Sequence, residues 1–205
     1  MNTIWNDGLS ARRTLDIGCG SGVLARALTD AGYDVLGIDA SPAMIELART
    51  TAPNARFAVA TFANATLPEC DAIVAMGEVL NYGTLEDVRA FIANAANALA
   101  PRGLLLFDVA ERGSYPAHDE RRIGGDDWSV IVIKDSDGQH LTRRVLTFRN
   151  VGGITRRDEE IHTLELYARK ELQSLLRERG FRVRIRRSYG SSRLPAGHAV
   201  YVAER

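Results

Sequence analysis

The sequence predicts an α/β protein built on a doubly wound, mostly parallel, seven-stranded sheet with a small antiparallel β insertion. Short apolar runs alternate with helical patterns through the first half of the chain, which is typical of βαβ units. After Glu111 the pattern changes to strand-like runs separated by Asp137-Gly138 and Gly152-Gly153 turns, which indicate an antiparallel hairpin or meander. These two observations together predict the fold class.

The helices of the main sheet are marked by their caps. Gly32 stops the first helix, and Ser41-Pro42 combines an N-cap with proline at the first helical position of the second. Thr84, with Asp87 three residues later, caps an alanine-rich helix that ends near Pro101. The expected helices are 22–31, 42–49, 84–101 and 170–179, and the expected strands of the sheet are 14–17, 35–39, 56–60, 72–75, 104–109, 181–185 and 198–203.

The insertion is expected to cover residues 111–167, between residues 1–110 and 168–205, which form the main domain. Its strands are expected at 128–134, 141–149 and 154–167, because these runs alternate or are apolar. The segment around His118, from Tyr115 to Glu120, reads as a loop.

Composition excludes several classes of protein. The chain is 45% hydrophobic and 25% charged, as is ordinary for a globular protein, and no apolar run approaches the roughly 20 residues that span a bilayer. The first residues lack the pattern of a secretion signal, so we expect a cytoplasmic protein without membrane contact. Two cysteines give neither a disulfide framework nor metal-ligand spacing, so we expect no metal.

The net charge is zero, although the part up to Ala110 is acidic and the rest is basic. The arginines of the basic half alternate with apolar residues, and acidic residues lie among them. This pattern favours a solvated sheet face and argues against nucleic acid as a partner.

The most informative motif is Leu15-Asp16-Ile17-Gly18-Cys19-Gly20-Ser21-Gly22, at the first strand-to-helix turn. Glycines at alternate positions let the backbone bend sharply and approach a ligand where a Cβ would clash. In doubly wound sheets the carboxyl end of the first strand is a place where ligands bind. The motif therefore predicts a ligand over the glycine loop.

Two carboxylates restrict the ligand. Asp39 ends the second strand, roughly 20 residues after the loop, where an acid accepts hydrogen bonds from ribose hydroxyls. The loop reads G-x-G-x-G and lacks the G-x-G-x-x-G spacing of dinucleotide sites. Asp16, just before the glycines, would repel a pyrophosphate but suits the ammonium of an amino-acid tail.

Four segments resemble the successive motifs of class I S-adenosylmethionine-dependent methyltransferases, which have a Rossmann-like sheet. The likeness runs from about Thr14 to Ala110, and the remainder looks like the bacterial small-molecule branch with an antiparallel insertion after the fifth strand. The segments are Leu15 to Gly22, Gly37-Ile38-Asp39-Ala40-Ser41, Cys70-Asp71-Ala72-Ile73-Val74 and Gly103-Leu104-Leu105-Leu106-Phe107-Asp108.

The resemblance implies binding of S-adenosylmethionine, release of S-adenosylhomocysteine, and transfer of the methyl group to nitrogen or oxygen of a small molecule. The loop would flank the methionine portion, and Ala40 the adenine edge. Where the family often has an acid for the adenine amino group, this chain has Thr61 and Phe62, which would act by hydroxyl, backbone or stacking. The implied cofactor-binding residues are Asp16, Gly18, Cys19, Gly20, Gly22, Asp39, Ala40, Thr61, Phe62 and Met76.

The candidates for catalysis follow from position. Methyl transfer is a direct displacement that depends on alignment, and a base is needed only when the acceptor is protonated. Glu78 and Tyr82 follow the fourth strand and His162 lies on the insertion, although a helix-start acid, a core aromatic and a half-exposed histidine are the alternative interpretations. Further pocket candidates are Asn81, Asp108, Glu111, Tyr115, His118 and Trp128.

Three other functions stay open. A cofactor-binding protein without turnover is suggested by the missing adenine acid and by the dozen residues before the first strand. The short lead also allows a homodimer in which a partner subunit covers the cofactor. An NAD-dependent oxidoreductase fits Asp39 but not the loop spacing, and a nucleic-acid methyltransferase fits neither the net charge nor Gly77-Glu78-Val79-Leu80.

Overall fold

The computed structural model describes residues 13–113 and 115–205, and its largest element is the predicted seven-stranded sheet. The strands are β1 (Arg13–Ile17), β2 (Asp34–Asp39), β3 (Arg56–Val59), β4 (Cys70–Ala75), β5 (Leu99–Ala110), β10 (Arg182–Arg186) and β13 (His198–Glu204). Their order is β10-β13-β5-β4-β1-β2-β3. Only β13 runs antiparallel to its neighbours β5 and β10, so the mostly parallel sheet is confirmed.

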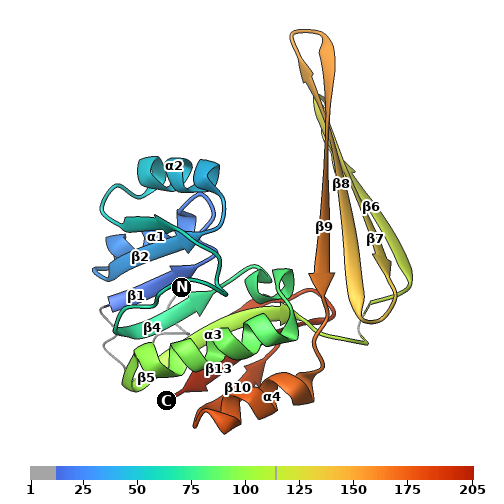
Figure 1. Ribbon diagram of the computed structural model, residues 1–205. Helices are drawn as coiled ribbons and strands as arrows, with labels where there is room; N and C mark the ends of the chain where they lie inside the picture. Colours follow the sequence, from blue (N-terminus) through green and yellow to red (C-terminus); the bar gives the residue numbers. More distant parts are fainter. Residues whose placement is uncertain (1–12, 114) are drawn as a thin grey trace.

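Helices cover both faces of this sheet (Figure 1). They are α1 (Val23–Asp30), α2 (Pro42–Thr51), the short 3₁₀ helix η1 (Val79–Tyr82), α3 (Leu85–Ala98) and α4 (Arg169–Glu178). Phe91 of α3 and Leu176 of α4 share one core with Phe107, whereas Leu28 of α1 shares the other with Leu106. Successive residues of β5 thus point to opposite faces, as in any strand. None of the described helices is both long and apolar enough to cross a membrane.

The predicted caps position the segments that enter the site. The hydroxyl of Ser41 accepts from the Met44 backbone N–H at 3.3 Å. The Thr84 hydroxyl accepts from the Asp87 N–H at 3.2 Å, and the Asp87 carboxylate accepts from the Thr84 N–H at 2.8 Å. Each cap is worth about 1 kcal/mol. The predicted end of this helix near Pro101 is wrong, because Leu99 already pairs with β4 as the first residue of β5.

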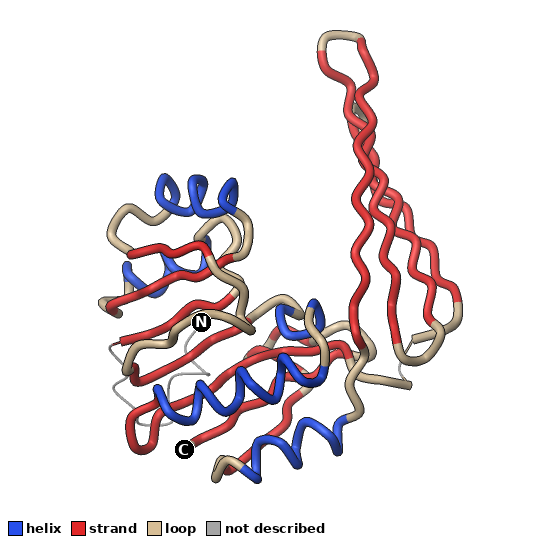
Figure 2. Tube along the Cα trace, in the orientation of Figure 1, coloured by secondary structure: helices blue, strands red, loops and turns tan. Residues whose placement is uncertain are grey.

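A second, four-stranded antiparallel sheet stands away from the main one and joins it at its base (Figures 1 and 2). We call its residues, 118–165, the lobe. The strands are β6 (His118–Gly124), β7 (Trp128–Ser136), β8 (His140–Val151) and β9 (Ile154–Glu165). The prediction of a loop around His118 is wrong, because residues 118–124 all pair with β7. Successive charges at 119–122 hide the alternation expected of a strand. The short hairpin of β11 (Ser188–Tyr189) and β12 (Ser192–Arg193) was also not expected.

Asn81 fixes the base of the lobe against the main sheet. Its Nδ2 donates to the carbonyls of Ala110, at 3.0 Å, and Glu165, at 2.5 Å, and its Oδ1 accepts from the Ala110 N–H at 2.9 Å. The Tyr167 hydroxyl donates to the Leu80 carbonyl at 2.9 Å. Side chain and backbone thus tie η1, the end of β5 and the end of β9 together, beside the carboxyl ends of the parallel strands.

Candidate functional site

The glycine loop, Gly18–Gly22, turns back over the end of β2. The backbone N–H groups of Gly18 and Cys19 both donate to the Ile38 carbonyl, at 2.7 and 3.1 Å. Gly18 has φ +68°, and a Cβ there would overlap the side chain of Val79. Gly20 has φ +51°, but a Cβ there would meet nothing within 4 Å. The first glycine is therefore required by the fold, whereas the second leaves open space over the loop.

Asp39 lies between the glycine loop and the start of α2. Its Oδ2 accepts from the Gly20 N–H at 2.8 Å, and its Oδ1 accepts from the Ser41 N–H at 2.9 Å. A carboxylate oxygen can accept more than one hydrogen bond, so both oxygens keep capacity for hydroxyl groups of a ligand. The adjacent Ala40 is exposed.

A hollow of about 400 Å³ lies beside the loop, lined by Asp16, Gly18, Cys19, Gly20, Ser21, Val23, Leu24, Ala27 and Met76. Asp16 is only 2% exposed, and its Oδ2 has no hydrogen-bond partner among the described residues. Burial and then the charge of Asp39 raise the pKa of Asp16 to about 7, against the effect of the Ala25 N–H. A ligand cation placed here would provide the missing partner.

Cys19 is a buried, neutral lining residue. Burial, with the charges of Asp16 and Asp39, raises the pKa of its thiol to about 12. The thiolate is the nucleophilic form of cysteine, so this side chain is inert at neutral pH.

The segment after β3 differs from expectation in part. The Phe62 ring is buried and packs edge-on against Phe91, with 5.8 Å between the ring centroids. It is therefore not available to stack on a ligand ring. Thr61 is exposed and forms a turn with Asn64, whose Oδ1 accepts from the Thr61 N–H at 2.9 Å.

Beyond β4, Glu78 joins three parts of the fold. Its Oε2 accepts from Nη2 of Arg143 on β8 at 2.5 Å, and its Oε1 is paired with Nε2 of His198 at the start of β13. Glu78 has φ +63°, which is strained for a residue with a side chain. The Asp108 carboxylate holds this turn by accepting from the N–H groups of Gly77, at 2.6 Å, and Glu78, at 3.3 Å.

The ion pair fixes the charge of both partners. Burial favours neutral Glu78, but the hydrogen bonds from His198 and Arg143 outweigh it and lower the pKa of Glu78 to about 2. Burial likewise opposes a charge on His198, but Glu78 raises the pKa of His198 overall. Glu78 is thus a poor proton acceptor at neutral pH, although it lies at the predicted place.

Tyr82 and His162 are in contact. The Tyr82 hydroxyl is 3.1 Å from Nδ1 of His162, and Nε2 of the same ring is 3.2 Å from Oε2 of Glu160. Burial raises the pKa of Tyr82. His162 is directly opposite Arg143 in the β8–β9 register, so both side chains project from one face of the lobe. We call Glu78, Tyr82, Arg143, His162 and His198 the lobe-facing cluster.

His118 and Glu111, two other pocket candidates, have structural partners, whereas Trp128, the first residue of β7, is exposed. His118 is on the opposite face of the lobe, 2.7 Å from Asp135. Glu111 is buried and accepts from Arg169, at 2.9 and 2.7 Å, and from Tyr201 at 2.9 Å. No group of three or more His, Cys, Asp or Glu side chains within 13–113 and 115–205 could hold a metal ion.

A methyltransferase domain model matches residues 14–103. A candidate methyltransferase of Geobacillus sp. (strain WCH70) is 30% identical over 188 residues, covering 84% of this chain and 75% of that protein. The chain belongs to the class I S-adenosylmethionine-dependent methyltransferases. A ubiquinone biosynthesis O-methyltransferase of Rhodopseudomonas palustris (strain BisB5) is 35% identical over 161 residues, which cover 71% of this chain but only 62% of that protein.

Solved structures agree with this methyltransferase fold. An S-adenosylmethionine-dependent methyltransferase from Clostridium acetobutylicum ATCC 824 has a TM-score of 0.84 at 16% identity, covering 94% of this chain and 83% of that chain. An amino pentose methyltransferase from Micromonospora echinaspora has a TM-score of 0.79 at 21% identity, covering 96% and 84%. The likeness spans the lobe as well as the main sheet.

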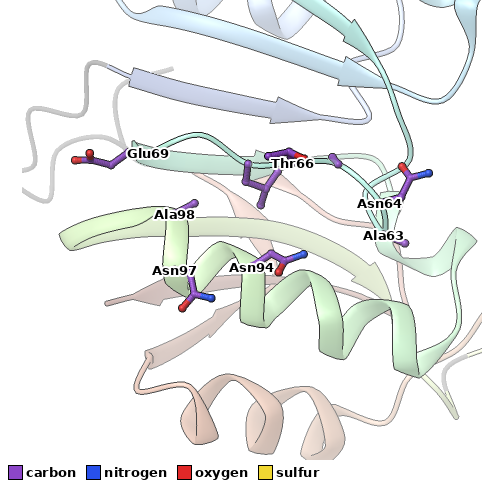
Figure 3. A pocket seen from close by; sticks show the side chains of 9 residues that line it. Ala63, Asn64, Thr66, Glu69, Asn94, Asn97 and Ala98 are labelled. Atoms are coloured by element: carbon purple, nitrogen blue, oxygen red, sulfur yellow. The ribbon is translucent and has the colours of Figure 1, made fainter.

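The methyltransferase chain has a second hollow, of about 430 Å³, between the segment after β3 and α3 (Figure 3). Asn64 and Thr66 line one wall, and Asn94 and Asn97 of α3 line the other. None of the predicted site residues lines it, and its one charged lining residue, Glu69, is paired with Arg13. The residues missed by the sequence analysis are instead Arg143 and His198.

Proposed function

We propose that this protein transfers the methyl group of S-adenosylmethionine to nitrogen or oxygen of a small molecule. The observation that carries the proposal is the pair of carboxylates beside the glycine loop. Asp39 keeps capacity for two ribose hydroxyls, and Asp16 presents an unpartnered, buried oxygen where an ammonium would fit. Because Gly20 has no side chain, the space above the loop is free for the part of the ligand that joins its ribose to its ammonium.

The cofactor supplies a sulfonium whose methyl group is open to direct displacement. The protein's own residues align the acceptor and exclude water, which can lower the barrier by about 7–11 kcal/mol. In this proposal the acceptor's hydroxyl or ammonium takes the place of the Tyr82 hydroxyl at Nδ1 of His162, and Nδ1 accepts its proton. Glu160, beside Nε2, stabilises the imidazolium that forms, and Tyr82, edge-on to the imidazole, positions the ring. Glu78 positions Arg143 and His198 and does not itself exchange a proton.

The relatives support both acceptor atoms, since one is named as an O-methyltransferase and a structural neighbour is named as a sugar N-methyltransferase. They give no support to the oxidoreductase alternative. The division into a main domain, residues 1–110 with 168–205, and an insertion, residues 111–167, stays a proposal, as does the role of the insertion in covering the substrate. A homodimer, a cytoplasmic location, and the absence of nucleic-acid and metal partners likewise stay predictions from the sequence.

The test is a calorimetric titration of S-adenosylhomocysteine into the wild type and into Asp39→Ala. We expect a dissociation constant of about 1 μM for the wild type and one at least tenfold higher for the variant. Asp34→Ala is the matched control, because Asp34 begins the same strand and its side chain bonds the exposed Arg56, away from the glycine loop. No binding to the wild type, or equal binding to Asp39→Ala, would refute the proposed cofactor site. Binding followed by a screen of amine and hydroxyl acceptors without turnover would favour a binding protein.

A further inference from the structure

Three basic side chains form a row across the lobe. Lys134 on β7 is directly opposite Arg143 on β8, and Arg143 is directly opposite His162 on β9. Directly opposed residues of antiparallel strands project from the same face of a sheet. This face meets the main sheet, because Arg143 bonds Glu78 and His162 contacts Tyr82. The Lys134 ammonium belongs to the same row and lies over the Tyr115 ring, 5.8 Å from its centroid.

The row has more positive charge than the described residues balance. Glu78 serves both Arg143 and His198. Lys134 has no carboxylate partner among residues 13–113 and 115–205. Its opposite neighbour on β6, Asp119, bonds Arg121 instead, at 3.3 Å.

Arg143 has a second, independent deficit. Its Nε is buried and has no hydrogen-bond partner among the described residues. A buried donor without an acceptor is destabilising, because it has lost its hydrogen bonds to water without replacing them. Lys134 is itself partly buried, and this burial, with the charge of Arg143, lowers the pKa of Lys134. Both side chains would gain from an oxyanion between them.

We propose that Lys134, together with Arg143, forms a subsite for an oxyanion, carboxylate or phosphate, carried by the methyl acceptor. This inference rests on the proposed function and adds the substrate class, which is a small acidic molecule. Its hydroxyl or amine is directed toward His162 while its anion binds Lys134 and Arg143. The Tyr115 ring forms a side wall of the subsite. The basic row then selects acidic acceptors over neutral ones of the same shape.

The chain has only two lysines, Lys134 and Lys170, which makes the test selective. Lys170 is exposed at the start of α4 and bears an internal control amine. The protein, saturated with S-adenosylhomocysteine, is labelled with trace acetic anhydride, and the labelling of each lysine is followed by peptide mass spectrometry. The probes are 4-hydroxybenzoate, phenyl phosphate and, as the neutral analogue of both, phenol.

We expect one or both acidic probes to slow the labelling of Lys134 severalfold while phenol has no effect and Lys170 is unchanged. Protection by only 4-hydroxybenzoate or only phenyl phosphate distinguishes a carboxylate subsite from a phosphate subsite. Equal labelling of Lys134 with and without both acidic probes overturns the inference. If S-adenosylhomocysteine itself fails to bind, it is the proposed function that fails.

Variants provide a second measurement. Lys134→Met should weaken binding of the protecting probe at least tenfold, Lys134→Arg should restore most of it, and Lys170→Met should leave it unchanged. The affinity for S-adenosylhomocysteine should be the same in all three variants, because Lys134 does not line the hollow beside the glycine loop. An unchanged affinity of Lys134→Met for the acidic probe contradicts the subsite.

Discussion

The hollow beside the glycine loop and the lobe-facing cluster are close neighbours that are assembled over very different distances in the sequence. Asp39 bonds the glycine loop from 19 residues away, within one βαβ unit. Glu78 reaches Arg143 across 65 residues and His198 across 120. A local motif thus builds the proposed cofactor site, whereas the proposed acceptor side depends on how the lobe and the last strand are placed.

The two regions also differ in charge. The carboxylate of Asp16 lines the hollow, and that of Asp39 bonds the glycine loop beside it. The lobe-facing cluster, with Lys134 beside it, has three cationic side chains around the carboxylate of Glu78, while His162 contacts that of Glu160. An acidic hollow suits a cofactor with an ammonium and a sulfonium, and a basic neighbour suits an acidic acceptor. The substitutions that follow test whether the two regions are separable.

The largest effect is expected on stability from Glu78→Gln. Removing one partner of a buried ion pair costs about 3–5 kcal/mol, because the cations left behind are uncompensated. Urea unfolding monitored by circular dichroism measures the loss. Asp135→Asn is the control, since it breaks the exposed pair with His118 and should leave the unfolding free energy nearly unchanged. A loss no larger than that of the control would mean that the pair is not formed in solution.

The same pair predicts a pH dependence of stability. The pKa of Glu78 is lowered from 4.5 to about 2, so its stabilisation is complete above 4.5 and disappears as the pH falls toward 2. The pKa of His198 is raised above 6.5, so its stabilisation is present below 6.5 and disappears as the pH rises through the folded value. The difference in unfolding free energy between wild type and Glu78→Gln should therefore be largest between about pH 4.5 and 6.5.

His162→Gln should separate chemistry from cofactor binding. Loss of a positioned base lowers turnover by about 100-fold or more, whereas the affinity for S-adenosylhomocysteine should stay the same. Tyr82→Phe keeps the ring but removes the hydroxyl that contacts His162, and should cause a smaller loss. Both are measured with an acceptor identified by screening, at several pH values. A lower cofactor affinity in either variant would show that the two regions are coupled.

The same contrast explains what the sequence could predict. The strands of the main sheet, the caps at Ser41 and Thr84, and the family followed from local patterns, since each depends on neighbours a few residues apart. Arg143 and His198 could not be found this way. One is an arginine among many on alternating strands, and its meaning depends on the lobe register. The other begins a strand that only the fold brings to Glu78.

Phe62 shows a further limit of sequence reasoning. Its position after β3 indicated contact with the adenine, but its direction depends on packing against Phe91 and Gly83 from other segments. Side-chain direction at the end of a strand is decided by tertiary contacts that a single sequence does not display.

Gly20→Ala should weaken cofactor binding while leaving the fold largely intact. Alanine in the left-handed backbone conformation of Gly20 lowers the stability by about 1–2 kcal/mol. The new Cβ would clash with nothing, because it meets no described atom within 4 Å. We expect at least a tenfold loss of affinity for S-adenosylhomocysteine by calorimetry. Gly18→Ala is the contrasting variant, since its Cβ overlaps Val79 and should reduce stability more than Gly20→Ala does. Full affinity in folded Gly20→Ala would mean that the ligand does not cover the loop.

The smallest effect is a pH dependence of cofactor affinity due to Asp16. Its pKa in the ligand-free fold is about 7, above the ordinary 3.8, because of burial and Asp39. A ligand ammonium favours the ionised carboxylate, so binding below this pKa must release a proton, and affinity should rise about tenfold from pH 6 to pH 8. Calorimetry in buffers of different ionisation enthalpy counts the proton directly. Asp16→Asn should bind more weakly and without this pH dependence. An affinity that does not change with pH would place the ligand ammonium away from Asp16.

The same carboxyl predicts a pH dependence of stability. Without ligand, the wild type should lose stability relative to Asp16→Asn as the pH rises from 3.8 through 7, because ionising the buried carboxyl disfavours the fold.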